Sequence, residues 1–323
     1  MSTATAVPET WELTGDDARE TLLHTGRRKL VRDAFLRLRA SDGFSHARSL
    51  AFALALVLVQ AIIALVGLAV ALGEGGASDV IVRSLEATAP GPAGDLLTSA
   101  VNQAHQAGAS NRYLALTLGL VGAIVTGTTL MGQFERALNR LYGVEADRPS
   151  VEKYTRAFVL TITVGVLVVL AFACLAFGRA IGQGLEDNPI ADIWAVVRWP
   201  LALALMMGAM ALLFRWSPKR HQPQWSWLAF GASISVLLWC AVTLALGWFF
   251  RVSTSFGETY GPLAGIVALL LWAFLSSVAV LFGAAVAAQL EAVRAGRSQP
   301  KDPRKADEPA HARDLVSASS TST

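Results

Sequence analysis

Six long runs of residues without a single aspartate, glutamate, lysine or arginine constrain this chain more than any other feature of its sequence. A hydrocarbon layer about 30 Å thick is crossed by about 20 helical residues, and five of the six runs reach that length. A backbone inside lipid must satisfy its own hydrogen bonds, so the runs are predicted to be helices. The alternating ten-residue segments of a membrane β-barrel are not seen. The runs are residues 50–72, 113–131, 157–178, 199–214, 226–250 and 263–290.

The fourth run is short for a membrane span, so its helix is expected to include residues 193–197 as well as Arg198. Hydrophobic residues make up 54% of the chain and charged residues only 16%, which excludes an ordinary soluble core. The predicted fold is therefore an all-α integral membrane protein, a bundle of six transmembrane helices in one domain.

Basic residues predict how this bundle is oriented. Of the 27 lysines and arginines, 22 lie in the two tails, in the second-to-third connection and in the fourth-to-fifth connection. Basic residues concentrate on the cytoplasmic side of membrane proteins. Both the N-terminus and the C-terminus are therefore expected in the cytoplasm.

The tails are predicted to differ from the membrane domain at residues 27–294. Polar residues 1–26 and residues 295–323 are expected to be disordered cytoplasmic tails. Residues 27–40, with the sequence RRKLVRDAFLRLRA, are predicted to form a basic amphipathic helix that binds anionic lipids of the inner leaflet. A helix packed on a cytoplasmic loop is the alternative. The apolar face is expected to contain Leu30, Val31, Ala34, Phe35 and Leu38.

Polar residues inside or beside the runs are the first candidate site residues. Thr126 and Thr129 either bond their own helix or, with Gln60 and Ser235, line a transport cavity. Where the second run ends, Glu135 and Asn139 lie four residues apart and share a helical face. They form either a membrane-boundary helix or a gate or ligand site.

The connection between the last two runs is the second candidate region. Its residues STSFGETYGP form either a tight turn or a site at the outer mouth, with Gly257, Glu258, Tyr260 and Gly261 as candidates. Small residues spaced four apart, Gly231 with Ser235 and Gly283 with Ala287, favour close contact between helices.

No residues point to catalysis. Cys174 and Cys240 lie inside apolar runs, and the five histidines lie in tails and loops without metal-ligand spacing. No nucleophile motif or phosphate loop is present. We therefore expect no catalytic residues, no metal, no cofactor, no nucleic-acid partner and no enzymatic activity.

Several motifs together resemble the YihY/virulence factor BrkB family over residues 35–291. The last run contains the pairs Tyr260-Gly261, Leu271-Trp272 and Gly283-Ala284, which look like the closing signature of that family. Two earlier connections are also similar, through the segments ALNRLYGVEADRP and FRWSPKRHQPQWSWLAFGA, with residues Asn139, Tyr142, Gly143, Arg148, Pro218, Trp227 and Gly231. The resemblance implies a bacterial inner-membrane protein with six helices and a poorly defined activity. An older ribonuclease label on the family has no support in these residues.

Three functions follow as hypotheses. The first is transport or flipping of a lipid or amphipathic envelope compound. The second is a non-transporting envelope scaffold that binds partner proteins, and the third is a membrane-bound enzyme. The lipid bilayer is the expected partner in each case, and the sequence leaves open whether the chain forms a homo-oligomer. Besides those already given, Trp272 and Gly283 are candidate structural-motif residues.

Overall fold

The structure is a computed structural model, and it describes residues 2–71, 91–110, 112–184, 189–253, 256, 260 and 263–302. This part of the chain is helical apart from its connections, and its sole β-contact is an antiparallel bridge between Ala4 and Lys301. The helices are α1 (Gly15–Thr25), α2 (Arg27–Ala40), α3 (Gly43–Ala71), α5 (Pro92–Ser110), α6 (Arg112–Leu141), α7 (Ser150–Gly184), α8 (Pro189–Trp216), α9 (Trp225–Val252) and α11 (Ala264–Arg294).

Six of these helices are long and apolar enough to cross a membrane, which confirms the predicted all-α architecture. The helix of the second run continues from residue 131 to Leu141, because a charged residue ends an apolar run without interrupting backbone hydrogen bonds. Helix α8 includes residues 193–197, as predicted, and continues through Pro200. The spans are Gly43–Leu68, Leu116–Leu141, Ser150–Leu175, Val196–Trp216, Trp225–Val252 and Ala264–Arg294.

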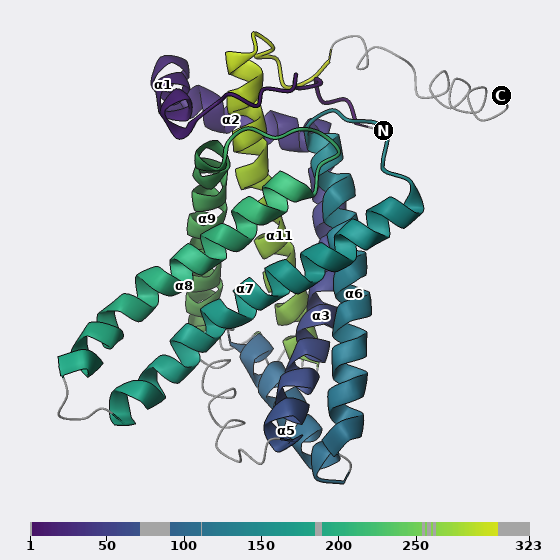
Figure 1. Cartoon of the computed structure of the whole chain (residues 1–323), viewed down its shortest axis with the longest axis vertical. Coiled ribbons are helices and arrows are strands. Elements are labelled where there is room, and N and C mark those ends of the chain that lie inside the picture. The colour runs from purple at the N-terminus through teal and green to yellow at the C-terminus, as the bar shows by residue number, and fades with distance from the viewer. Residues whose placement is uncertain are drawn as a thin grey trace, which may run out of the picture.

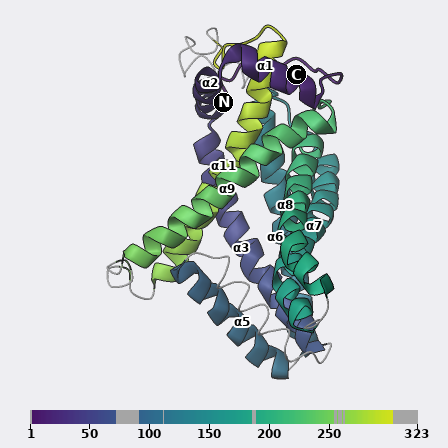
Figure 2. The ribbon, with the colours of Figure 1, turned by 90° about the vertical axis from the view of Figure 1, so that its left-hand side faces the viewer.

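The six spans close into a ring. Helix α3 packs on α6 and α11, α6 on α7, α7 on α8, α8 on α9, and α9 on α11. Helices α7 and α8 form an antiparallel pair that lies in front of the other spans (Figure 1). Helix α5 packs on α3, α6 and α11 at the lower end of the molecule (Figure 2).

The segments that carry most of the basic residues meet at the opposite end, which we call the basic end. Here the N-terminal residues lie beside residues 140–149, residues 217–224 and residues 300–302 (Figure 1). The charge pattern had assigned all of these segments to one side of the membrane, and the structure places them together.

The expectation of disorder for residues 1–26 is wrong for the part that the structure describes. Residues 2–13 form an extended segment, which we call the strap, and residues 15–25 form α1. The strap is held by backbone pairing, because the amide of Thr3 donates to Ala40 at 2.8 Å and that of Val7 donates to Tyr142 at 3.0 Å. Backbone pairing leaves no side-chain pattern, so composition did not reveal it.

The C-terminal tail is only partly described. Residues 295–302 leave α11 and return to the strap, where the amide of Asp302 donates to the carbonyl of Thr3 at 2.9 Å. These eight residues are therefore ordered by contacts, against the expectation of disorder. Residues 303–323 lie outside the described residues.

Small residues join α9 to α11, as their spacing predicted. A Cβ atom added to Gly283 would lie 2.0 Å from the hydroxyl of Ser235 and 2.6 Å from the carbonyl oxygen of Gly231. The Ser235 hydroxyl donates to the carbonyl of Val280 at 3.2 Å, across the helix contact. The two backbones approach so closely that no side chain fits between them.

We expect Gly283→Leu to lower the thermal unfolding temperature of the detergent-solubilised protein by several degrees, because overpacking costs about 1–3 kcal/mol or more. Gly247→Leu is the matched control on α9, since a Cβ atom there meets nothing within 4 Å. Tryptophan fluorescence during heating measures both variants. An equal loss of stability in the two would contradict this account of the α9–α11 contact.

Candidate functional site

The basic end brings together four of the predicted site residues, Glu135, Asn139, Tyr142 and Gly143. Asn139 is fully buried and joins two connections. Its amide nitrogen donates to Asp147 at 3.2 Å, and its oxygen accepts from the backbone amide of Lys219 at 2.7 Å. Asn139 thus joins the end of α6 to the α6–α7 connection and to the α8–α9 connection.

Glu135 forms a buried ion pair with Arg148. The two side chains are 3% and 6% exposed, and their charged atoms lie 3.3 Å apart. Arg148 also donates to the carbonyls of Ser217 and Pro218, each at 2.8 Å. One guanidinium therefore ties α6 to the connection between α8 and α9, which is a structural role for both charges.

Asp147 lies beside this pair and remains ionised. Burial raises its pKa, but the Asn139 hydrogen bond and several positive charges outweigh burial, so that the pKa lies below its ordinary value. The positive charges are those of Lys153, Arg140 and Arg136.

Tyr142 and Gly143 form the turn on which the strap rests. Gly143 has φ of +73°, in the left-handed region that favours glycine. A Cβ atom there would lie 2.6 Å from the Cα atom of Ala6, so only glycine allows the strap to approach. The Tyr142 side chain points inward and is 2% exposed.

Beneath the strap lies a set of buried polar side chains that we call the covered cluster: Arg37, Tyr142, Arg220, Gln222, Gln289 and Glu291. The Nε atom of Arg37 donates to Gln289 at 2.7 Å. Arg220 donates to Glu291 at 2.5 Å, and its guanidinium lies 4.5 Å from the centre of the Tyr142 ring. Four elements contribute to this cluster: α2, α11, the end of α6 and the connection after α8.

Burial shifts the pKa values of Arg37 and Tyr142. It lowers the pKa of Arg37 to about 10, although Tyr142 and Glu291 favour the charged form, and Arg37 is still protonated at neutral pH. Burial and the charge of Glu291 raise the pKa of Tyr142, so its phenol stays neutral.

Sequence reasoning missed Arg37, although three of the five residues that it placed on the apolar face of residues 27–40 are buried: Leu30, Ala34 and Leu38. That face was expected to include Val31 and Phe35, which are 53% and 43% exposed. The buried positions are instead 30, 33, 34, 37 and 38, which follow the spacing of a helix face. This face includes Asp33 and Arg37. The helix itself was predicted with correct bounds.

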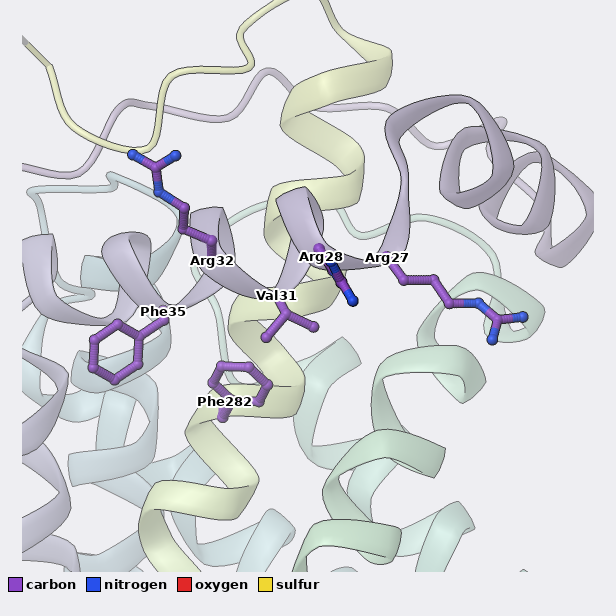
Figure 3. A pocket seen from close by; sticks show the side chains of 6 residues that line it. All are labelled: Arg27, Arg28, Val31, Arg32, Phe35 and Phe282. Carbon is purple, nitrogen blue, oxygen red and sulfur yellow. The ribbon is translucent and has the colours of Figure 1, made fainter.

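The exposed residues Val31 and Phe35 lie on a second face of α2, and this face forms a groove with α11. The groove has a volume of about 480 Å³ and is lined by Arg27, Arg28, Val31, Arg32, Phe35 and Phe282. Val31 points toward Phe282, and the Phe35 ring lies on the same side of α2, whereas the guanidinium of Arg32 points to the other side (Figure 3). Arg27 and Arg28 lie at one end of the groove (Figure 3).

The polar residues Thr126, Thr129, Gln60 and Ser235, which were predicted either to bond within the helices or to line a cavity, have hydrogen-bond partners in the structure. The Thr126 hydroxyl donates to Gln60 at 2.9 Å, which pairs α6 with α3. Thr129 donates to the carbonyl of Val125 in its own helix, and Ser235 lies in the α9–α11 contact. These bonds agree with the first of the two interpretations of the threonines, in which polar groups pair within a helix or a helix contact.

Of the other predicted site residues, Tyr260 and Trp272 are among the described residues. Gly257, Glu258 and Gly261 lie outside the described residues. The Tyr260 ring lies 4.7 Å from that of Phe256. The indole of Trp272 donates to Thr243 at 3.1 Å, so Trp272 joins α11 to α9. Within the described residues, no group of three or more histidine, cysteine, aspartate or glutamate side chains could hold a metal ion.

Known proteins similar to this chain include membrane proteins and a ribonuclease-like protein. The family model described as Virulence factor BrkB matches residues 34–309. The putative ribonuclease-like protein YfkH of Bacillus subtilis (strain 168) is 24% identical over 265 residues, which are 80% of this chain and 94% of that protein.

Two further relatives are UPF0761 membrane proteins. IL2447 of Idiomarina loihiensis is 24% identical over 192 residues, which are 59% of this chain and 67% of that protein. XCC0860 of Xanthomonas campestris is 26% identical over 180 residues, which are 54% of this chain and 41% of that protein. The match thus spans less than half of the Xanthomonas protein. No solved structure matches the chain.

Replacing Arg148 by glutamine is expected to destabilise the protein by about 3–5 kcal/mol, because it leaves Glu135 charged and unpaired in a buried position. Arg136→Gln is the matched control, since Arg136 is 57% exposed where it pairs with Asp147. Such an exposed pair contributes about 0–1 kcal/mol. Denaturant unfolding followed by tryptophan fluorescence measures both.

The double variant Glu135→Gln/Arg148→Gln tests whether Glu135 and Arg148 stabilise the protein as an ion pair or independently of each other. We expect it to be more stable than Arg148→Gln alone, because no buried charge remains without a partner. A double variant that loses the sum of both single losses would show that the two side chains act independently.

Proposed function

This chain belongs to the virulence factor BrkB family, as its motifs predicted, and we propose that it binds an anionic amphipathic envelope compound and moves it between the two leaflets of the membrane. The observation that supports this proposal is the groove between α2 and α11. It combines arginine side chains with an apolar floor at the end of the membrane spans. The ligand class that matches both parts is an anionic lipid.

The chemistry of the groove suits such a ligand. Arg27 and Arg28 lie exposed at one end of the groove, and no ion pair with an acid is found for them within the described residues. A guanidinium binds phosphate oxygens in a bidentate manner, and basic residues near an anionic leaflet each contribute about 1 kcal/mol. Val31, Phe35 and Phe282 offer an acyl chain an apolar surface.

A cytoplasmic position of the basic end is consistent with the binding of anionic lipid in the groove. The basic end carries the groove, and the excess of basic residues at this end is typical of the cytoplasmic side. Anionic lipids of the inner leaflet would then meet the groove directly. The proposal assigns no catalytic residue, no metal and no cofactor, and the ribonuclease-like name belongs to the Bacillus subtilis relative.

A non-transporting scaffold is the second candidate function. It is favoured by the pairing of Thr126 with Gln60 and by the burial of Ser235 between helices, because polar groups that stabilise helix contacts are not available to a passing substrate. Under this alternative the groove holds a lipid that stays bound, and partner proteins of the envelope are assembled on the bundle.

Reconstitution into liposomes with a panel of fluorescently labelled lipids tests the proposed function. We expect movement of anionic lipids between leaflets well above that of empty vesicles, because the groove selects anionic headgroups. The double variant Arg27→Gln/Arg28→Gln is expected to slow anionic lipids about thirtyfold, since two arginines together contribute about 2 kcal/mol, and to leave zwitterionic lipids little changed.

The matched control is Arg19→Gln/Arg39→Gln, which removes the same charge at exposed positions outside the groove. Native mass spectrometry of the same proteins measures retention of anionic lipid. Retention that depends on the groove arginines, without movement of any lipid above empty vesicles, would favour the scaffold. If retention is also independent of these arginines, the groove assignment is wrong.

A further inference from the structure

The strap lies over the covered cluster, and three of its residues form hydrogen bonds with side chains of the cluster. The carbonyl oxygen of Thr5 accepts from Arg37 at 2.9 Å, and that of Pro8 accepts from Arg220 at 3.0 Å. The hydroxyl of Thr10 donates to Glu291 at 2.5 Å. Three strap residues thus contact the three charged side chains of the cluster.

The charges of the cluster do not balance. Two guanidinium groups, Arg37 and Arg220, face one carboxylate, Glu291, and the side chains of all three are at most 1% exposed. The remaining buried neighbours are the neutral side chains of Tyr142, Gln222 and Gln289. A buried positive charge without a counterion is unfavourable, and neutral carbonyl oxygens compensate it less well than an oxyanion does.

Several polar atoms of the cluster have no hydrogen-bond partner. They include one terminal nitrogen on each arginine and one oxygen of Glu291. Buried polar groups in native proteins are normally paired, so unpaired ones in a charged cluster require an explanation. The two free guanidinium nitrogens offer donors that the strap carbonyls do not use.

We propose that Arg37 and Arg220 form an oxyanion-binding site that the chain's own strap, residues 2–13, occupies and closes in this structure. The carbonyls of Thr5 and Pro8 take the place of ligand oxygens. A phosphate group, free or carried by a phosphoester headgroup, supplies the missing negative charge and pairs the free guanidinium nitrogens. Binding therefore requires the strap to leave.

This site is separate from the α2–α11 groove, because Arg37 belongs to the buried face of α2 and the groove arginines to its exposed face. The proposal therefore does not rest on lipid movement. It predicts that oxyanions open the strap in the purified protein, whether or not the protein moves lipids.

Cysteine labelling of the full chain in detergent tests this prediction. Ala4 is a strap residue that is fully buried in the closed structure. A cysteine at this position, Ala4→Cys in a Cys174→Ala/Cys240→Ala background, should therefore react with a maleimide only when the strap opens. We expect inorganic phosphate to raise the labelling rate several-fold, whereas sodium chloride at the same ionic strength does not. A parallel arm with glycerol 3-phosphate shows whether a phosphoester headgroup opens the strap better than free phosphate does.

Arginine variants separate a specific site from a general effect of salt. Arg37→Gln is expected to abolish the response to phosphate, measured as the ratio of rates with and without the anion. This ratio remains informative if the variant also loosens the strap. Arg39→Gln is the matched control, because Arg39 is an exposed residue of the same helix. A labelling rate that phosphate leaves unchanged, or a full response in Arg37→Gln, would overturn the proposal.

A disulfide lock provides the second test. Ala4 and Lys301 face each other in the antiparallel bridge, so Ala4→Cys/Lys301→Cys in the same background can hold the strap closed. Titration calorimetry with phosphate should show binding to the reduced protein and its loss, at least tenfold in affinity, after oxidation. Equal binding by the oxidised and reduced forms would show that the strap does not close the site.

Discussion

Lipid offers a peptide group no hydrogen-bond partner, and this constraint determines where the chain can place its polar groups. Inside the spans, polar side chains pair within a helix or between two helices, as Thr126 does with Gln60. Charged residues therefore collect at the ends of the bundle. At the basic end they hold the connections together through hydrogen bonds to backbone carbonyls, of which the two bonds from Arg148 are the clearest example.

The fold could be predicted from sequence because run length and charge report directly on the membrane. Six spans, their order, the bounds of α2 and the family all followed from local patterns. The close α9–α11 contact followed from the spacing of Gly283 and its neighbours. Each of these signals lies in a continuous stretch of sequence and depends little on the rest of the fold.

The candidate site could be predicted only in part. Glu135 and Asn139 were found because they share a helical face where the second apolar run ends, and Tyr142 was found through the family resemblance. The covered cluster was not found, because Arg37 meets Glu291 and Arg220 only through tertiary packing. The strap was missed for a related reason, since its amides and carbonyls bind other segments and any sequence of suitable length supplies such groups.

Helix α2 contributes one face to the covered cluster and another to the groove, so a movement of this helix affects both. A helix of 14 residues is about 21 Å long and behaves as one stiff rod. Its inner face carries Arg37 under the strap, and its outer face carries Val31 and Phe35 in the groove. A rotation of the rod that widens the groove also shifts Arg37 against the strap. A ligand that turns α2 from one face would therefore change the affinity for a ligand at the other face, and this coupling is equal in both directions.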